Sequence, residues 1–121
     1  MILVVDDDPA FRDAAQEAMG TQYQVFVAAN AAQPWQLALK RGFSAILIDL
    51  CLGQENGFSL IEELHHSFLK LPVIAITGAL SRNTLESAME FGAAGVLEKP
   101  ISPDWIPAVA DAERRATAVR P

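Results

Sequence analysis

The sequence predicts an α/β fold in which a doubly wound, five-stranded parallel sheet carries helices on both faces. Two observations carry this prediction. Five short apolar runs alternate with five stretches of helical periodicity along the chain. The runs also lack the regular apolar and polar alternation of strands that face water on one side, which indicates that both faces are covered. Strands that alternate with helices pair in parallel through right-handed crossovers.

The five apolar runs are the predicted strands. Each is too short for a helix, and several are rich in valine and isoleucine, which favour strands. The strands are expected at Ile2 to Val5, Val25 to Ala28, Ala45 to Ile48, Val73 to Ile76 and Gly95 to Leu97.

The first predicted helix has clear start and stop signals. Asp8 is a candidate N-cap, Pro9 suits the first helical position, and Gly20 suits the end. Its inward face is expected to comprise Phe11, Ala14, Ala15 and Ala18. The other helices are expected at about residues 32–40, 58–68, 83–91 and 103–118. Pro107 removes a backbone donor, so it should distort or delay the first turn of the last helix.

Composition limits the class of protein. A chain of 121 residues with 51% hydrophobic residues suits one domain, residues 1–121, and no linker or repeat divides it. No apolar run approaches the roughly eighteen residues needed to cross a bilayer, and no signal peptide is visible. The single cysteine, Cys51, excludes an internal disulfide and fits the cytoplasm. A net charge of −6 argues against direct nucleic-acid binding.

Polar residues follow four of the five predicted strands, at the sheet edge where open α/β folds form their sites. Asp6 and Asp7 follow the first strand, Asp49 the third, Thr77 the fourth and Lys99 the fifth. Clustered carboxylates form a site for a hard cation, and Mg²⁺ typically uses one or two carboxylates with waters and a phosphate oxygen. The sequence therefore predicts Mg²⁺ as the cofactor, which would relieve the repulsion among the acids.

The same residues suit phosphoryl transfer. In this chemistry the protein mainly positions groups and stabilises charge on the transferred oxygens. Asp49 is the expected nucleophile. Mg²⁺, the Lys99 ammonium and the Thr77 hydroxyl would each hold a phosphoryl oxygen.

Over essentially its whole length, the chain resembles the receiver domain of two-component response regulators, which has a flavodoxin-like fold. The matching stretches are ILVVDDDPAFR, ILIDLCLGQENGFSLIEEL, PVIAITG and FGAAGVLEKPIS. The resemblance implies that Asp49 is the phosphoacceptor, that Asp6 and Asp7 are the acidic Mg²⁺ pair, and that the Cys51 backbone carbonyl is a further ligand. It implies that Thr77 and Lys99 contact the phosphoryl group, and that the Lys99–Pro100 bond is cis.

The resemblance also implies partners. A histidine kinase or a histidine phosphotransfer protein would supply the phosphoryl group and meet the first helix near Phe11, Arg12 and Ala15. A downstream protein or a covalently linked output domain would respond, and the chain would not be a dedicated enzyme. The implied output surface comprises Glu86, Glu90, Phe91, Val96 and Trp105. Its two aromatic residues would either anchor a partner or pack within the domain.

Two positions depart from the family pattern. Gly53 stands where proline is usual, which suggests a looser loop. Val96 stands where many members carry an aromatic ring that moves together with the residue at the Thr77 position, and a short, stiff valine cannot do this. The small Gly78 is expected to leave Asp49 accessible to the donor and to water.

Other readings remain open. The chain is either a phosphorylation switch or a pseudo-receiver that acts only as a protein interaction module. An aspartate-based phosphatase would need a second acid two residues after the nucleophile, and Cys51 occupies that position. The sequence is compatible with a stand-alone receiver and with a piece of a larger regulator or hybrid kinase.

Overall fold

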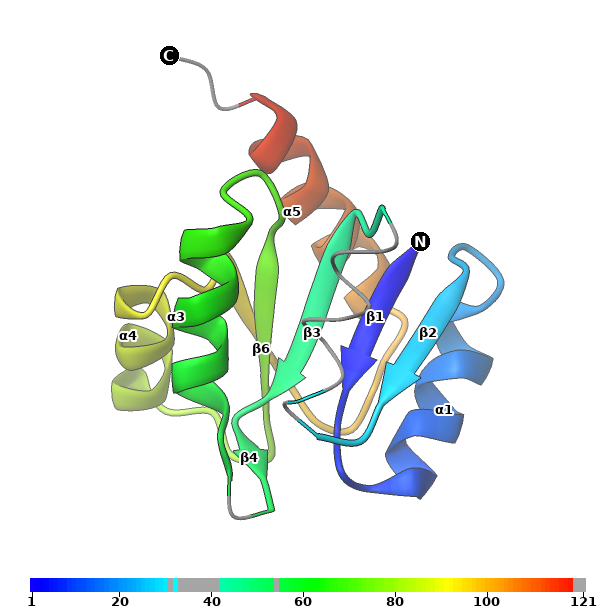
Figure 1. Ribbon diagram of the computed structural model, residues 1–121. Helices are drawn as coiled ribbons and strands as arrows, with labels where there is room; N and C mark the ends of the chain where they lie inside the picture. Colours follow the sequence, from blue (N-terminus) through cyan, green and yellow to red (C-terminus); the bar gives the residue numbers. More distant parts are fainter. Residues whose placement is uncertain (31, 33–41, 54, 119–121) are drawn as a thin grey trace.

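The computed structural model describes residues 1–30, 32, 42–53 and 55–118. A central sheet lies between two layers of helices (Figure 1). The helix expected at residues 32–40 falls almost wholly outside the described residues. The other four helices and all five strands are present where the sequence predicts them.

The central sheet has the order β2-β1-β3-β6-β7, and every neighbouring pair is parallel. The predicted doubly wound parallel sheet is therefore confirmed. Its strands are β1 (Ile2–Val5), β2 (Val25–Ala28), β3 (Ala45–Asp49), β6 (Val73–Thr77) and β7 (Gly95–Glu98). The last three each extend one residue beyond the prediction, into the polar residues of the candidate site.

The register of the sheet brings the strand ends together. Val5 pairs with Ile48, so Asp6 emerges beside the end of β3. At the other side of β3 the register continues through β6 to β7, where Thr77 pairs with Glu98. The carboxyl ends of the strands thus form one edge.

Four helices cover the sheet. They are α1 (Pro9–Met19), α3 (Gly57–Ser67), α4 (Arg82–Glu90) and α5 (Trp105–Ala118). As predicted, Asp8 caps α1, since its Oδ1 accepts a hydrogen bond from the Ala10 N–H at 3.0 Å. Figure 1 shows α3 and α4 on one side of the sheet and α1 with α5 on the other.

Alternate residues of the same strands face two separate cores. In β1, Leu3 and Val5 point to the core under α3 and α4, while Ile2 and Val4 point to the core under α1 and α5. All four are completely buried. This explains why the strands are apolar at successive positions.

The last helix begins at Trp105 rather than at residue 103. Pro107 then occupies the first turn, where a backbone N–H has no partner within the helix, so its missing donor costs little. The preceding turn is closed by hydrogen bonds from Trp105 N to Ser102 O and from Ile106 N to Pro103 O. The expected delay of this helix is confirmed.

A short hairpin between β3 and α3 was absent from the prediction. Its strands are β4 (Cys51–Leu52) and β5 (Glu55–Asn56), which pair antiparallel. Gly53 between them has φ +60°, a conformation that proline cannot adopt. A glycine here therefore suits the observed turn.

Within the described ranges, no helix combines the length and the apolar character needed to cross a bilayer.

Candidate functional site

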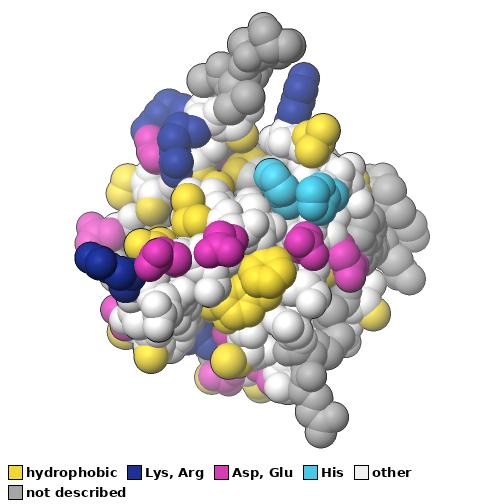
Figure 2. Space-filling view, turned by 90° about the vertical axis from the view of Figure 1, so that its left-hand side faces the viewer, with side chains coloured by type: hydrophobic (Ala, Val, Ile, Leu, Met, Phe, Trp, Pro, Cys, Tyr) yellow, Lys and Arg dark blue, Asp and Glu magenta, His cyan; other side chains and the backbone are white. Residues whose placement is uncertain are grey.

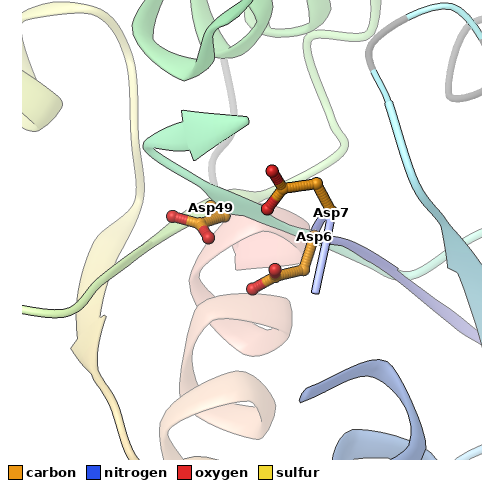
Figure 3. A group of neighbouring side chains, drawn as sticks. All are labelled: Asp6, Asp7 and Asp49. Atoms are coloured by element: carbon orange, nitrogen blue, oxygen red, sulfur yellow. The ribbon is translucent and has the colours of Figure 1, made fainter. Parts of the chain in front are cut away.

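Three aspartates meet at the carboxyl edge of the sheet. Each of Asp6, Asp7 and Asp49 offers a carboxylate oxygen, and these three atoms all lie within 4.8 Å of one another (Figure 3). Asp6 and Asp49 are buried, with 0% and 6% of their surface exposed, whereas Asp7 is exposed. The cluster thus opens to solvent on the side of Asp7.

Asp6 is held from several directions. Its Oδ1 accepts a hydrogen bond from the Asp8 N–H at 2.9 Å, and its backbone oxygen accepts one from Arg12 Nη1 at 2.8 Å. Its Oδ2 lies 2.8 Å from the Lys99 ammonium, but the angles of this ion pair are not those of a hydrogen bond. One buried carboxylate oxygen therefore retains lone pairs for a further cation.

Asp49 is oriented by the loop that follows it. Its Oδ1 accepts the Cys51 N–H at 2.9 Å, and its Oδ2 accepts a hydrogen bond from Lys99 Nζ at 3.0 Å. Gly57 packs so closely that a Cβ there would overlap the backbone oxygen of Asp49. The position of Asp49 thus depends on the absence of a side chain at residue 57.

Lys99 links the two buried acids. Its ammonium lies 4.5 Å from the centre of the Phe11 ring, which in turn packs against Trp105 at 5.8 Å. The face of an aromatic ring attracts a cation, so Phe11 helps to place the ammonium. The Lys99–Pro100 peptide bond is cis, as the resemblance implied.

The pKa values of these groups shift because of burial and pairing. Burial raises the pKa of Asp6 above its ordinary value; the neighbouring Lys99 ammonium and the hydrogen bond from the Asp8 N–H partly oppose this, and the Asp49 charge adds to it. For Lys99, burial alone would lower the pKa, but its close pairing with Asp6 and Asp49 raises it. The lysine therefore stays cationic beside the two acids.

Thr77 lies at the same edge, 9% exposed, at the end of β6. Its hydroxyl donates to the Ala79 carbonyl at 3.3 Å and accepts from the Ala79 N–H at 3.2 Å. Among the described residues it makes no hydrogen bond to the three aspartates. The threonine is thus near the site but occupied by its own loop.

The donor set fits a hard divalent cation. Carboxylate oxygens suit Mg²⁺, and the buried Asp6 Oδ2 without a hydrogen bond is the kind of atom that a metal would satisfy. Asp7 supplies an exposed carboxylate, which leaves room for water. The residues at this edge could therefore hold the predicted metal.

Several expected surface residues are buried instead. Phe11 and Ala15 face the core, with 8% and 1% exposure, whereas Arg12 between them is partly exposed. The kinase contact near these three residues stays a prediction. Trp105 is 3% exposed, and Phe91 is partly buried against Phe58 at 5.3 Å. Both aromatic residues of the implied output surface thus pack within the domain, because the two cores require large side chains there.

Sequence reasoning also missed two contributors. It did not identify the ring of Phe11 as a neighbour of Lys99, or the contact in which Glu98 accepts the Leu80 N–H at 2.9 Å. The only indication in the sequence that Glu98 could take part was its position at the end of a predicted strand, next to Lys99. Side-chain direction beyond the strand end depends on the loop, which sequence periodicity does not describe.

The chain is similar to known proteins over most of its length. The model of the response regulator receiver domain family matches residues 2–111. The chain is 32% identical over 106 residues to the alginate biosynthesis transcriptional regulatory protein AlgB of Pseudomonas putida, covering 87% of this chain and 24% of that protein. It is 31% identical over 120 residues to the C4-dicarboxylate transport transcriptional regulatory protein DctD of Pseudomonas aeruginosa, covering 98% of this chain and 25% of that protein. The chain thus spans about a quarter of the length of these relatives.

Solved structures show the same architecture. A CheY-like response regulator receiver domain protein from Methanospirillum hungatei superposes with a TM-score of 0.86 at 26% identity, covering 96% of this chain and 94% of that chain. NtrX from Brucella abortus superposes with a TM-score of 0.85 at 28% identity, covering 96% of this chain and 27% of that chain. The chain therefore belongs to the family of response regulator receiver domains, the signalling modules of two-component systems.

Proposed function

We propose that residues 1–121 form a single receiver domain that works as a phosphorylation switch, with Asp49 as the phosphoacceptor. A histidine kinase or a histidine phosphotransfer protein would be the donor. Phosphorylation would change the affinity of a downstream protein or of a covalently linked output domain. The domain would assist its own phosphorylation and dephosphorylation without being a dedicated enzyme.

One observation carries this proposal. The Lys99 ammonium contacts Asp6 and Asp49 at once, at 2.8 and 3.0 Å, beside a third carboxylate. A cation and several acids gathered at a largely buried sheet edge are poor for stability alone, because desolvating charges is costly. They suit a site that receives a charged phosphoryl group.

The chemical step is a displacement at phosphorus. A carboxylate oxygen of Asp49 attacks the phosphorus atom of a phosphohistidine and forms an acyl phosphate, and the P–N bond breaks with its electron pair left on the imidazole. Lys99 is close enough to pair with the transferred oxygens. The Thr77 hydroxyl would reach them after it leaves Ala79.

The metal in this proposal is Mg²⁺. Asp6, Asp7 and Asp49 would hold it through carboxylate oxygens, and Cys51 through its backbone carbonyl. When bound, Mg²⁺ would offset the negative charge that the acids and the phosphoryl group bring together. The buried Asp6 Oδ2, which pairs with Lys99 but accepts no hydrogen bond, supports this assignment.

The surface around α4 is the proposed contact for the output partner. Figure 2 shows apolar atoms lying between acidic side chains on this side of the molecule. Leu85 and Met89, one turn apart on α4, are 42% and 47% exposed. They would provide the apolar contacts for which Trp105 and Phe91 are too buried. The proposed partner is a protein and not nucleic acid or a membrane, and the proposed location is the cytoplasm.

Phosphorylation can be tested directly. The protein is incubated with Mg²⁺ and acetyl phosphate, and its intact mass is compared with that of Asp49→Asn. We expect a phosphoryl mass gain in the wild type alone, lost when EDTA removes the metal. No gain under conditions that label a known receiver would overturn the proposal and favour the pseudo-receiver reading.

A further inference from the structure

The loop between β6 and α4 is tied down at two neighbouring residues. Ala79 is bonded through both its N–H and its carbonyl to the Thr77 hydroxyl. Leu80 donates its N–H to Glu98 Oε2 at 2.9 Å. The first contact comes from the strand that leads into the loop, and the second comes from a different strand.

Glu98 is well placed for the second contact. It ends β7 and lies directly opposite Thr77 in the sheet register, while its neighbour Lys99 donates its N–H to the Thr77 carbonyl at 2.8 Å. Its carboxylate reaches past Thr77 to the loop. The backbone under this contact is thus part of the sheet, whereas Leu80 itself is 44% exposed.

We propose that Glu98 is a positioning residue that holds the loop in its resting arrangement and thereby keeps the Thr77 hydroxyl on Ala79. This inference rests on the proposed function, since it concerns how Thr77 becomes available to a phosphoryl group on Asp49. In the phosphorylated state, Leu80 leaves Glu98 as Ala79 leaves Thr77.

The hydrogen-bond inventory explains the coupling. A threonine hydroxyl has one proton, which the resting structure gives to the Ala79 carbonyl. Donation to a phosphoryl oxygen requires that this bond break. As long as Glu98 holds Leu80, the adjacent Ala79 stays within reach of Thr77, so the two contacts favour the same loop position.

This device acts without a large moving side chain. Val96, the residue that pairs with Ala75 in the neighbouring strand, is short and stiff at χ1. The hydrogen bond between the Glu98 carboxylate and the Leu80 N–H can form or break without any movement of an aromatic ring. The resting state is therefore stabilised by Glu98 at the loop itself.

The contact can be tested first in the unphosphorylated protein. Hydrogen exchange and the NMR chemical shift of the Leu80 amide are compared in wild type, Glu98→Ala and Glu98→Gln. Glutamine retains an acceptor oxygen but not the charge. In the alanine variant we expect faster hydrogen exchange of the Leu80 amide and shifted NMR signals of the Leu80 and Ala79 amides. The glutamine variant should stay close to the wild type in both measurements. Unchanged amides in Glu98→Ala would overturn the contact.

The second measurement is the initial rate of Asp49 phosphorylation by acetyl phosphate. Loss of one hydrogen bond typically shifts a two-state equilibrium about threefold to tenfold, so Glu98→Ala should react faster by up to that factor. Glu98→Gln should stay near the wild-type rate. If both variants accelerate equally, the effect comes from charge alone and the positioning role is wrong.

A matched control separates general charge effects. Glu62 is exposed on α3, so Glu62→Gln removes one negative charge away from the loop. It should leave both readouts unchanged. If the wild type takes no phosphoryl group, the proposed function fails, while the exchange of the Leu80 amide still decides whether Glu98 holds the loop.

Discussion

The ammonium of Lys99 lies 2.8 Å from the Oδ2 atom of Asp6, a side chain with no exposed surface. The same nitrogen lies 3.0 Å from Asp49. One cation therefore partly compensates two buried acids that would otherwise repel each other. A site that depends on one lysine for this compensation should respond strongly to its removal.

Replacing Lys99 by methionine should destabilise the metal-free protein. The apolar stem is kept and the charge is lost, so Asp6 and Asp49 remain as uncompensated anions. We expect a loss of roughly 2 kcal/mol in the free energy of unfolding, less than for a fully buried pair because 25% of the Lys99 side chain is exposed. Urea unfolding measures this loss, and Mg²⁺ should restore part of it.

The control for this variant is Lys70→Met, which removes a positive charge from an exposed turn. Its stability should differ little from that of the wild type, with or without metal. Equal losses in the two variants would mean that general charge balance, rather than the contact with the two acids, determines stability.

Asp6→Asn should change how stability depends on pH. The folded-state pKa of Asp6 is raised above 3.8, chiefly by burial. The contribution of protonated Asp6 to the free energy of unfolding is therefore fully present below pH 3.8 and is lost as the pH rises through the folded-state pKa. In EDTA, the asparagine variant should gain stability relative to the wild type as the pH rises from 3.8 through the folded-state pKa of Asp6. A difference that stays constant across this range, measured by urea unfolding, would contradict the burial argument.

The core and the candidate site could be predicted from the sequence because strand periodicity places them together. The apolar runs locate the strands, and in parallel strands the residues after each run share one edge of the sheet. Asp6 and Asp49 therefore come together without any knowledge of the loops. The cap at Asp8 was equally local, since it depends on the next two residues only.

Long-range side-chain contacts could not be predicted in this way. Trp105 is an interface candidate by residue type, yet at the start of the final helix it fills the core beside Phe11. The hairpin at Gly53 depends on a positive φ that a proline-based family pattern does not anticipate. The helix at residues 32–40 remains a prediction, as do the roles of the site residues.

The only tyrosine of the chain, Tyr23, should titrate at unusually high pH. Its hydroxyl donates to Glu113 Oε1 at 2.8 Å, and burial together with this carboxylate raises its pKa to about 12 from 10.0. A raised folded-state pKa means that this stabilisation is intact below pH 10 and is lost as the pH rises toward 12. Absorbance of the phenolate gives the pKa without interference from a second tyrosine.

Glu113→Gln provides the comparison for this titration. It removes the negative charge but keeps an acceptor, so the pKa of Tyr23 should fall toward its ordinary value while burial keeps part of the shift. Titration of the wild type near 10 in native buffer would show that the Tyr23 to Glu113 contact is not maintained in solution.

Gly57→Ala should damage the candidate site and the fold together. The added Cβ would overlap the Asp49 carbonyl oxygen and would lie 2.7 Å from the Leu50 Cα, both of which are backbone atoms that cannot rotate away. Moving this backbone displaces Asp49 relative to Lys99, and overpacking typically costs about 1–3 kcal/mol. Thermal unfolding should show a loss of stability, and acetyl phosphate labelling should show a loss of phosphorylation.

Gly95→Ala is the matched control, since its Cβ would meet nothing within 4 Å, and it should retain both properties. Equal behaviour of the two variants would mean that the chain around Asp49 tolerates a side chain at residue 57.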